Sequence, residues 1–277
     1  MCVEFFIRAL LAVGLVVLTG CSSLSRSNPL RSGQWAPVPE LTDEFDGDKL
    51  DSSKWFDRDP SWKGRQPGLY SPKNVTVSDG DLLLTARLEE VTNAPDGYHT
   101  FTTAAVKSKA SVLYGYFEAR CQPMRSHASS GFWFNGGGKD WWTEIDVFEV
   151  GPVGPKHGKT VYSSAHVFRA PGLQKSFSKP HGYTPPFDIS GDYHTYGLLW
   201  DPERIVWYVD GVETRKLENT HWHRPFQLNL NSETKPNWFG LPDQSELPGT
   251  FKVDYVRAWR RLDLAGPVSK AQGSTSK

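Results

Sequence analysis

The feature that most constrains the fold is a series of short strand-like segments separated by turn residues. Each segment is rich in aromatic or β-branched residues and is bounded by Gly, Pro, Ser or Asp, which is the pattern of β-strands. No long stretch repeats its apolar positions at the helical period. The expected strands span residues 81–88, 115–121, 130–135, 143–149, 162–168, 194–200, 204–209, 212–216, 226–232 and 251–260.

These segments together predict an all-β fold. Asp210-Gly211 lies between two of them, and an Asp-Gly pair in this position is the strongest short signal for a β-hairpin. Many strands joined by turns, without alternating helices, indicate an antiparallel β-sandwich of jelly-roll type. A β-barrel with a similar number of strands is the structural alternative.

The first residues of the chain have a different composition. Residues 1–20 contain an apolar run after Arg8, which is the pattern of a secretory signal peptide and is too short to span a bilayer. The run ends in Leu18-Thr19-Gly20-Cys21, which resembles the lipobox of bacterial lipoproteins. The resemblance implies a lipid on Cys21 that holds the protein in the cell envelope, at the outer membrane or the periplasmic face. A plain signal peptide of a secreted protein is the alternative.

One folded domain is expected at residues 36–263, between a tether at residues 21–35 and a disordered tail at residues 264–277. Its only cysteine is Cys121, which is expected to be buried, so no internal disulfide is predicted. The 31 basic and 31 acidic residues give a net charge of zero, so no global field attracts nucleic acid or an anionic membrane. A monomer is expected, with the lipid as its only membrane contact.

The most informative segment is residues 144–149, which read Glu-Ile-Asp-Val-Phe-Glu. Residues two apart on a strand share a face, so Glu144 and Asp146 point the same way. Regular alternation would send Glu149 into the core, where an unpaired carboxylate is costly. One extra residue in the Val-Phe pair, a β-bulge, would return Glu149 to the face of the other two acids, with one of that pair packed inward.

Three carboxylates on one exposed face repel one another, which a purely structural strand does not require but glycoside cleavage does. A retaining glycosidase places two carboxyl groups about 5–5.5 Å apart, whereas an inverting enzyme needs about 6.5–9.5 Å to fit a water. Neighbouring positions on one face of a bulged strand favour the shorter separation. Repulsion also raises the pKa of one member, as an acid catalyst requires. A metal-binding strand or a solvated acidic strand is the alternative interpretation.

The same segment resembles the bulged Glu-x-Asp-x-x-Glu signature of glycoside hydrolase family 16. That family includes agarases, porphyranases, κ-carrageenases and laminarinases, and the extra residue favours its bulged branches. The resemblance covers most of the chain after the signal peptide. It is carried also by residues 43–55, 74–82, 114–120, 130–134 and 251–259.

This resemblance implies a concanavalin-like jelly roll with a substrate cleft on its concave sheet. It implies that Glu144 is the nucleophile, Glu149 the acid/base and Asp146 a helper to both. It also implies that no cofactor and no catalytic metal is required. A structural Ca²⁺ occurs on the convex side in the family, but the sequence contains no ligand run that locates one.

Six further side chains are expected to bind the substrate. Trp133 resembles a stacking tryptophan of the family, and an indole laid on a sugar face fixes the ring position. Arg65 offers a fork of donors to sulfate or hydroxyl oxygens. A core role for the tryptophan and a solvated loop arginine are the structural alternatives. The six candidates are Trp62, Arg65, Trp133, Trp142, His166 and Glu233.

Two departures leave the polysaccharide open. Agarase-like chains often follow the glutamate equivalent to Glu233 with a Trp-Arg pair, whereas this chain has Thr234-Lys235. The segment at residues 169–183 matches no single specificity. The sequence predicts a retaining endo-β-glycanase for a red-algal galactan, agarose or porphyran. A κ-carrageenase, a β-1,3-glucanase (laminarinase) or a transglycosylase are alternative enzymes, and a non-catalytic carbohydrate-binding lipoprotein is the alternative of another class.

Overall fold

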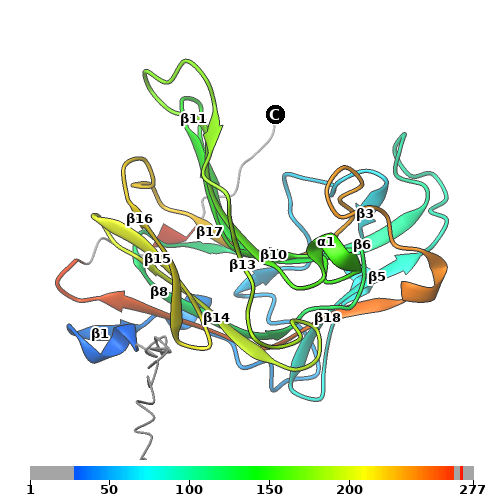
Figure 1. Ribbon diagram of the computed structural model, residues 1–277, viewed down its shortest axis with the longest axis horizontal. Coiled ribbons are helices and arrows are strands. Elements are labelled where there is room, and N and C mark those ends of the chain that lie inside the picture. The colour runs from blue at the N-terminus through cyan, green and yellow to red at the C-terminus, as the bar shows by residue number, and fades with distance from the viewer. Residues whose placement is uncertain (1–27, 265–268, 271–277) are drawn as a thin grey trace, which may run out of the picture.

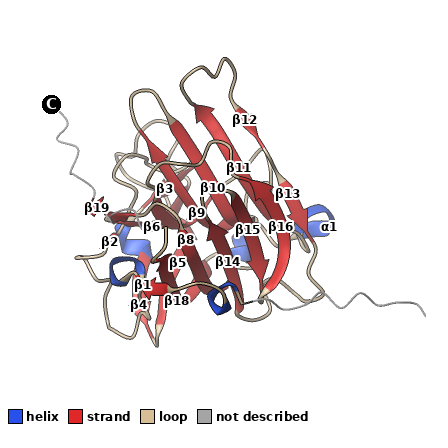
Figure 2. Cartoon of the chain, turned by 90° about the vertical axis from the view of Figure 1, so that its left-hand side faces the viewer, coloured by secondary structure: helices blue, strands red, loops and turns tan. Residues whose placement is uncertain are grey.

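The computed structural model describes residues 28–264 and the pair 269–270. Strands dominate the described chain, and its helices are single turns (Figure 2). The predicted signal peptide at residues 1–20 and the predicted lipid-bearing Cys21 lie outside the described residues. A search of the described residues finds no helix with the length and apolar character needed to cross a bilayer.

The strands form two largely antiparallel arrays, which we call the back sheet and the front sheet (Figure 1). In the back sheet the order is β4-β5-β18-β8-β14-β15-β16, and β1 pairs with the last residues of β18. These strands are β1 (Trp35–Pro37), β4 (Val75–Ser78), β5 (Asp81–Leu88), β8 (Gly115–Gln122), β14 (His194–Trp200), β15 (Arg204–Val209), β16 (Val212–Glu218) and β18 (Gly249–Arg261).

The front sheet has the order β6-β17-β9-β10-β11. β2 and β3 pair with β6, β3 in the parallel sense, and β12 and β13 pair with β11. A short pairing of β5 with β6 joins the two sheets. The strands are β2 (Trp55–Phe56), β3 (Gly68–Tyr70), β6 (Phe101–Ser108), β9 (Ser129–Gly137), β10 (Trp142–Val150), β11 (Val161–Arg169), β12 (Phe177–Ser178), β13 (His181–Tyr183) and β17 (Gln227–Glu233).

The remaining elements are short. β19 (Ser269–Lys270) pairs with β7 (Ala110–Ser111), so two residues of the expected disordered tail form a strand. Within the expected tether, Leu30 packs against a small buried cluster of the back sheet. The helical turns are α1 (Gly154–His157) and the 3-10 helices η1 (Pro29–Arg31), η2 (Pro39–Leu41), η3 (Pro72–Asn74) and η4 (Gln244–Glu246).

Aromatic side chains from both sheets fill the core between them. The ring of Phe134 in β9 lies 4.8 Å from that of Phe117 in β8. The ring of Phe148 in β10 lies 4.2 Å from Tyr196 and 5.9 Å from Phe251. Each buried ring of this size contributes roughly 1.5–3 kcal/mol. This packing fixes the register of β9 and β10, and therefore which of their residues face outward.

The predicted all-β sandwich is confirmed, and the barrel alternative is wrong because the strands pack as two layers. All the predicted strands are present, with ends that agree within two residues. The predicted hairpin joins β15 to β16, and both of its turn residues have positive φ, 48° at Asp210 and 73° at Gly211, as a type I′ turn requires. Cys121 is a buried free thiol, as expected.

Candidate active site

The predicted bulge lies in β10. Asp146 is opposite Trp133 of β9, and Phe148 is opposite the next residue, Phe132, so Val147 has no partner on that strand. The sequence led us to expect one inward-facing residue in the Val-Phe pair, which was wrong. Both Val147 and Phe148 are buried in the core, because the bulge turns two successive side chains inward.

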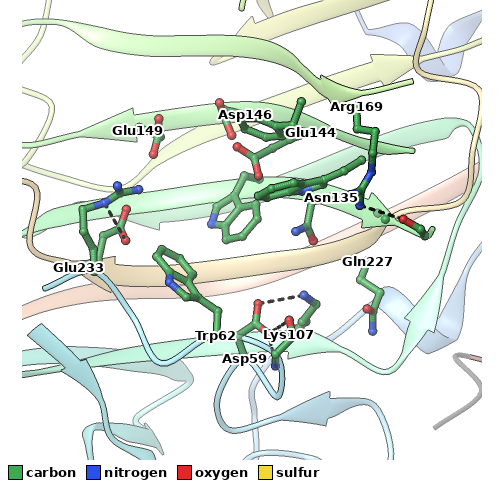
Figure 3. Close-up of a pocket in the computed structure, with 18 of the residues that line it drawn as sticks. Asp59, Trp62, Lys107, Asn135, Glu144, Asp146, Glu149, Arg169, Gln227 and Glu233 are labelled. Carbon is green, nitrogen blue, oxygen red and sulfur yellow. Dashed lines mark hydrogen bonds and ion pairs between the residues drawn. The ribbon is translucent and has the colours of Figure 1, made fainter. Parts of the chain in front are cut away.

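The bulge places the three acids of β10 together on the outer face of the front sheet. Glu144, Asp146 and Glu149 all line one cleft of about 990 Å³, and Figure 3 shows them projecting into it from the same strand. The cleft is open to solvent at Glu149, whose side chain is 18% exposed, whereas Asp146 is only 3% exposed. Three acids from one strand therefore face a cavity large enough for an extended sugar chain.

Their proximity alters the acidity of the group. Burial raises the pKa of Glu144 well above its ordinary value, and the nearby charges of Asp146 and Glu149 raise it further. Burial also raises the pKa of Asp146 to about 6, with Glu149 adding to the effect and a hydrogen bond to His166 opposing it. The cluster therefore retains a proton at a pH where isolated carboxyl groups are ionised.

His166 orients Asp146. Its Nε2 lies 2.8 Å from Asp146 Oδ2, and its Nδ1 lies 2.6 Å from Ser178 Oγ. Burial lowers the pKa of His166, but the hydrogen bond and charge of Asp146 raise it above its ordinary value overall. His166 thus contacts a catalytic candidate from the neighbouring strand β11, where it lies opposite Glu144, and it is not among the residues that line the cleft.

The same residues form a set that could hold a metal ion. Glu144, Asp146 and His166 each offer one ligand atom, and these atoms lie within 4.8 Å of one another. His166 Nε2 is already in a hydrogen bond with Asp146 Oδ2, so two of the three ligands satisfy each other. The structural Ca²⁺ that the family resemblance allows on the convex side of the sandwich stays a prediction.

Lys235 is a central residue of the site that sequence reasoning missed. Its ammonium group forms ion pairs with Glu149 and, at 2.7 Å, with Glu233, and its side chain is 8% exposed. Burial lowers the pKa of Lys235, but the two glutamates raise it above its ordinary value overall. The available signal was its closeness in sequence to Glu233, the last residue of β17.

Trp133 reaches the cleft, as predicted, while Phe134 faces the core. The Nε1 of Trp133 donates to Asn231 Oδ1 at 3.0 Å, and Asn231 Nδ2 donates to the hydroxyl of Tyr70 at 2.8 Å. A Cβ at Gly131 would lie 2.6 Å from Asn231 Oδ1, so glycine leaves the space that Asn231 occupies. Asn231 therefore positions the indole, a role that the sequence did not indicate.

The loop between β2 and β3 supplies the opposite wall. Arg65 lies 3.6 Å from Glu233 Oε2, with its guanidinium 5.6 Å from the ring of Trp62, so these three predicted residues meet. That oxygen of Glu233 is buried without a hydrogen-bond partner among the described residues. Below them, Lys107 and Asp59 form a buried ion pair at 2.9 Å that the sequence did not predict (Figure 3).

The two adjacent tryptophans before the acids differ in role. Trp142 lines the cleft and is 42% exposed, and its ring lies 4.3 Å from Phe168. Trp141 stacks on Phe226 at 6.5 Å and does not line the cleft. Only Trp142 is therefore placed to touch a ligand.

Two indole groups hold the catalytic strand from the core side. Trp207 Nε1 donates to the carbonyl of Asp146 at 2.8 Å, beside the bulge. Trp222 Nε1 donates to the carbonyl of Glu144 at 2.9 Å. Both tryptophans are buried, so these hydrogen bonds fix the backbone from which the acids project.

Comparison with known proteins agrees with this geometry. Residues 35–261 match the family described as "Beta-porphyranase A-D, GH16 domain". β-Porphyranase D of Zobellia galactanivorans is 29% identical over 88% of this chain, and the match spans 65% of that protein, just under two thirds. The κ-carrageenase of Pseudoalteromonas carrageenovora is 29% identical over 91% of this chain and 72% of its own length.

Solved structures share the fold. Porphyranase B of Zobellia galactanivorans superposes with a TM-score of 0.76 at 24% identity, covering 86% of this chain and 99% of that one. The κ-carrageenase of Pseudoalteromonas carrageenovora in complex with an oligosaccharide gives a TM-score of 0.70 at 25% identity, over 85% and 99% of the two chains. The predicted jelly-roll fold and family are confirmed, and the chain belongs to glycoside hydrolase family 16.

Proposed function

We propose that this protein is a retaining endo-β-glycanase that hydrolyses a red-algal galactan, with porphyran and agarose as the first candidates. The observation that carries the proposal is the bulged strand β10, which projects three carboxyl groups from one face into an open cleft. Burial and mutual repulsion within this cluster raise the pKa of Glu144 and Asp146. A protein that only binds carbohydrate does not require such a cluster.

In the proposed reaction, Glu149 donates a proton to the glycosidic oxygen while the Glu144 carboxylate attacks the anomeric carbon. The leaving sugar departs with the proton, and a covalent glycosyl-enzyme remains. Glu149, now ionised, takes a proton from water, which attacks the anomeric carbon and releases Glu144. Asp146, held by His166, hydrogen-bonds the nucleophile and tunes both glutamates.

The roles of nucleophile for Glu144 and acid/base for Glu149 need a direct test. The pKa of Glu144 is raised, and a raised pKa is also expected of an acid catalyst. Azide distinguishes the roles on an oligosaccharide with an aryl leaving group. With Glu149→Ala, azide should intercept the glycosyl-enzyme and give the β-glycosyl azide. With Glu144→Ala, azide should replace the missing carboxylate and give the α-glycosyl azide. The reverse pair of products would exchange the assignments.

Two features support a galactan. Arg65 stands half-exposed on the cleft wall beside Trp62, where it offers donors to sulfate or hydroxyl oxygens. The family match is to the domain of β-porphyranases. Similarity to a κ-carrageenase keeps κ-carrageenan as the second candidate substrate.

The deciding experiment measures reducing-end release by the chain without residues 1–21 on porphyran, agarose, κ-carrageenan and laminarin. We expect release from porphyran or agarose, and a loss of at least about a hundredfold in Glu144→Gln. Release only from κ-carrageenan or laminarin would keep the mechanism and replace the substrate. Binding to a polymer without release by the wild type would establish the carbohydrate-binding alternative instead.

A further inference from the structure

Four cationic side chains line the cleft, and three of them have an acidic partner. Lys107 pairs with Asp59 at 2.9 Å, and Lys235 and Arg65 both lie against glutamates of the site. Arg169 differs, because within the described chain it forms no ion pair with an acidic residue. Among the described residues it is therefore the cleft cation without an acidic partner.

The position of Arg169 leaves most of its donors unused. It is the last residue of β11, directly opposite Trp142 of β10. Its Nη2 donates to the carbonyl of Gly138 at 2.9 Å, which fixes one edge of the guanidinium (Figure 3). A guanidinium carries five N–H donors in a rigid fork. The remaining donors have no partner among the described residues and are free for a ligand.

An exposed aromatic surface lies beside this guanidinium. Trp142 is 42% exposed, and Phe168, which also lines the cleft, lies 4.3 Å from it at an interplanar angle of 36°. Phe168 in turn stacks on His166 at 5.3 Å and 3°. Exposed aromatic rings in a cleft favour stacking on the apolar face of a sugar.

The floor next to these residues consists of backbone alone. Gly136, Gly137 and Gly138 line the cleft, and a Cβ at Gly136 would lie 2.5 Å from the carbonyl of Pro225. A Cβ at Gly138 would lie 2.7 Å from the indole nitrogen of Trp141. The packing therefore requires glycine at these two positions, and neither adds a side chain to this part of the cleft.

We propose that Arg169, Trp142 and Phe168 form a subsite for a sugar residue that carries a sulfate ester. The aromatic pair holds the ring, and the free edge of the guanidinium binds two sulfate oxygens. Trp142 lies two residues before Glu144 on the same face of β10, so the subsite adjoins the reaction centre. This inference rests on the proposed function, and it favours a sulfated galactan over a neutral one.

The test compares porphyran with the same polymer after desulfation. Arg169→Met should lower the ratio of kcat/KM on sulfated to desulfated polymer by about 10–100-fold, the factor expected for charge-assisted hydrogen bonds. Arg169→Lys, which keeps the charge and loses the fork, should recover part of that ratio. Trp142→Ala should lower kcat/KM on both polymers alike, since stacking does not depend on sulfate. Arg87→Met, at an exposed arginine of β5, is the matched control and should leave the ratio unchanged.

The outcomes separate this inference from the function itself. An unchanged ratio in Arg169→Met, in an enzyme that hydrolyses galactan, would overturn the subsite and leave the function standing. An equal loss on both polymers would also overturn it. Should the wild type hydrolyse neither polymer, calorimetry of a sulfated galactan oligosaccharide with Glu144→Gln still decides. Binding that weakens by about tenfold or more with Arg169→Met would support the subsite, and binding that does not weaken would refute it.

Discussion

At the scale of single residues, Lys235 is the cation that opposes the repulsion among the acids of the cleft. Burial raises the pKa of Glu144 and Asp146, and the ammonium of Lys235 opposes that rise at both groups. It does so from a buried position between Glu149 and Glu233. Lys235 therefore acts on the reaction through the carboxyl groups that it contacts.

Lys235→Met should move the acidic limit of kcat/KM to higher pH. In the proposed mechanism Glu144 must be ionised to attack. Loss of the cation raises its pKa further, so a larger fraction stays protonated at a given acidic pH. The free energy of unfolding should fall by about 3–5 kcal/mol, since the buried carboxylate of Glu233 and the partly buried carboxylate of Glu149 lose their partner. A pH–rate profile with thermal unfolding as the fold check measures both effects.

Two controls accompany this variant. Lys235→Arg keeps the charge and should restore the acidic limit toward that of the wild type. Lys73→Met, at an exposed lysine in η3, should leave the profile unchanged. An acidic limit that stays in place in Lys235→Met would show that the lysine has only a structural role.

The site residues that could be predicted from the sequence are those whose positions follow from local spacing. Glu144, Asp146 and Glu149 lie within one strand, so their common face follows from alternation and one bulge. Lys235 and Glu149 are 86 residues apart in the chain, and Lys107 and Asp59 are 48 apart. Such pairs meet only through the order of strands in the sheet, which no local pattern specifies.

At the scale of elements, the bulge of β10 forms the site and also leaves backbone groups that need hydrogen-bond partners. Val147 has no partner on β9, and a bulge interrupts the regular ladder of hydrogen bonds. The indole of Trp207, from β15 in the opposite sheet, donates to the carbonyl of Asp146 beside it. The back sheet thus fixes the backbone of the catalytic strand.

Trp207→Phe should therefore affect both stability and catalysis. It keeps a buried ring but leaves the carbonyl of Asp146 unpaired, which costs about 1–3 kcal/mol. The loosened strand should lower kcat by roughly 10–100-fold. Trp55→Phe is the matched control, since it removes a buried indole hydrogen bond to Asp43, and it should lower only stability. Equal kcat in the two variants would contradict a role for Trp207 in positioning the acids.

The element-scale predictions were most accurate for strands rich in aromatic or branched apolar residues. β5, β14 and β15 begin and end where their composition predicted. β6 was missed, and every residue from Phe101 to Ser108 in it is buried. Burial does not explain the difference, because β14 and β15 are also buried along most of their length. The Thr-Thr-Ala-Ala centre of β6 lacks the aromatic or branched apolar residues that mark the other strands.

At the scale of the whole molecule, the sandwich holds a group of acids whose mutual repulsion lowers the stability of the fold. The aromatic core between the sheets fixes β10, and β10 holds three acids at a separation where they repel. Burial and repulsion raise the pKa of Glu144 in the folded chain above that of the unfolded chain. As pH rises through this interval, the unfolded state loses its proton first, so the folded state becomes relatively less stable.

Glu144→Gln should consequently stabilise the protein while abolishing activity. Glutamine cannot ionise, so at pH 8 the variant avoids the buried charge, and its Tm should exceed that of the wild type by about 2–4 °C, the shift that ~1 kcal/mol produces in a domain of this size. At pH 4, where the wild-type carboxyl group is protonated in the folded state and mostly protonated in the unfolded state, the difference should become small. Glu213→Gln, at an exposed glutamate of β16, should change Tm at neither pH. Thermal unfolding at the two pH values measures these differences. A variant that is less stable than the wild type at pH 8 would show that the carboxylate is compensated within the cleft, and that catalysis here does not oppose stability.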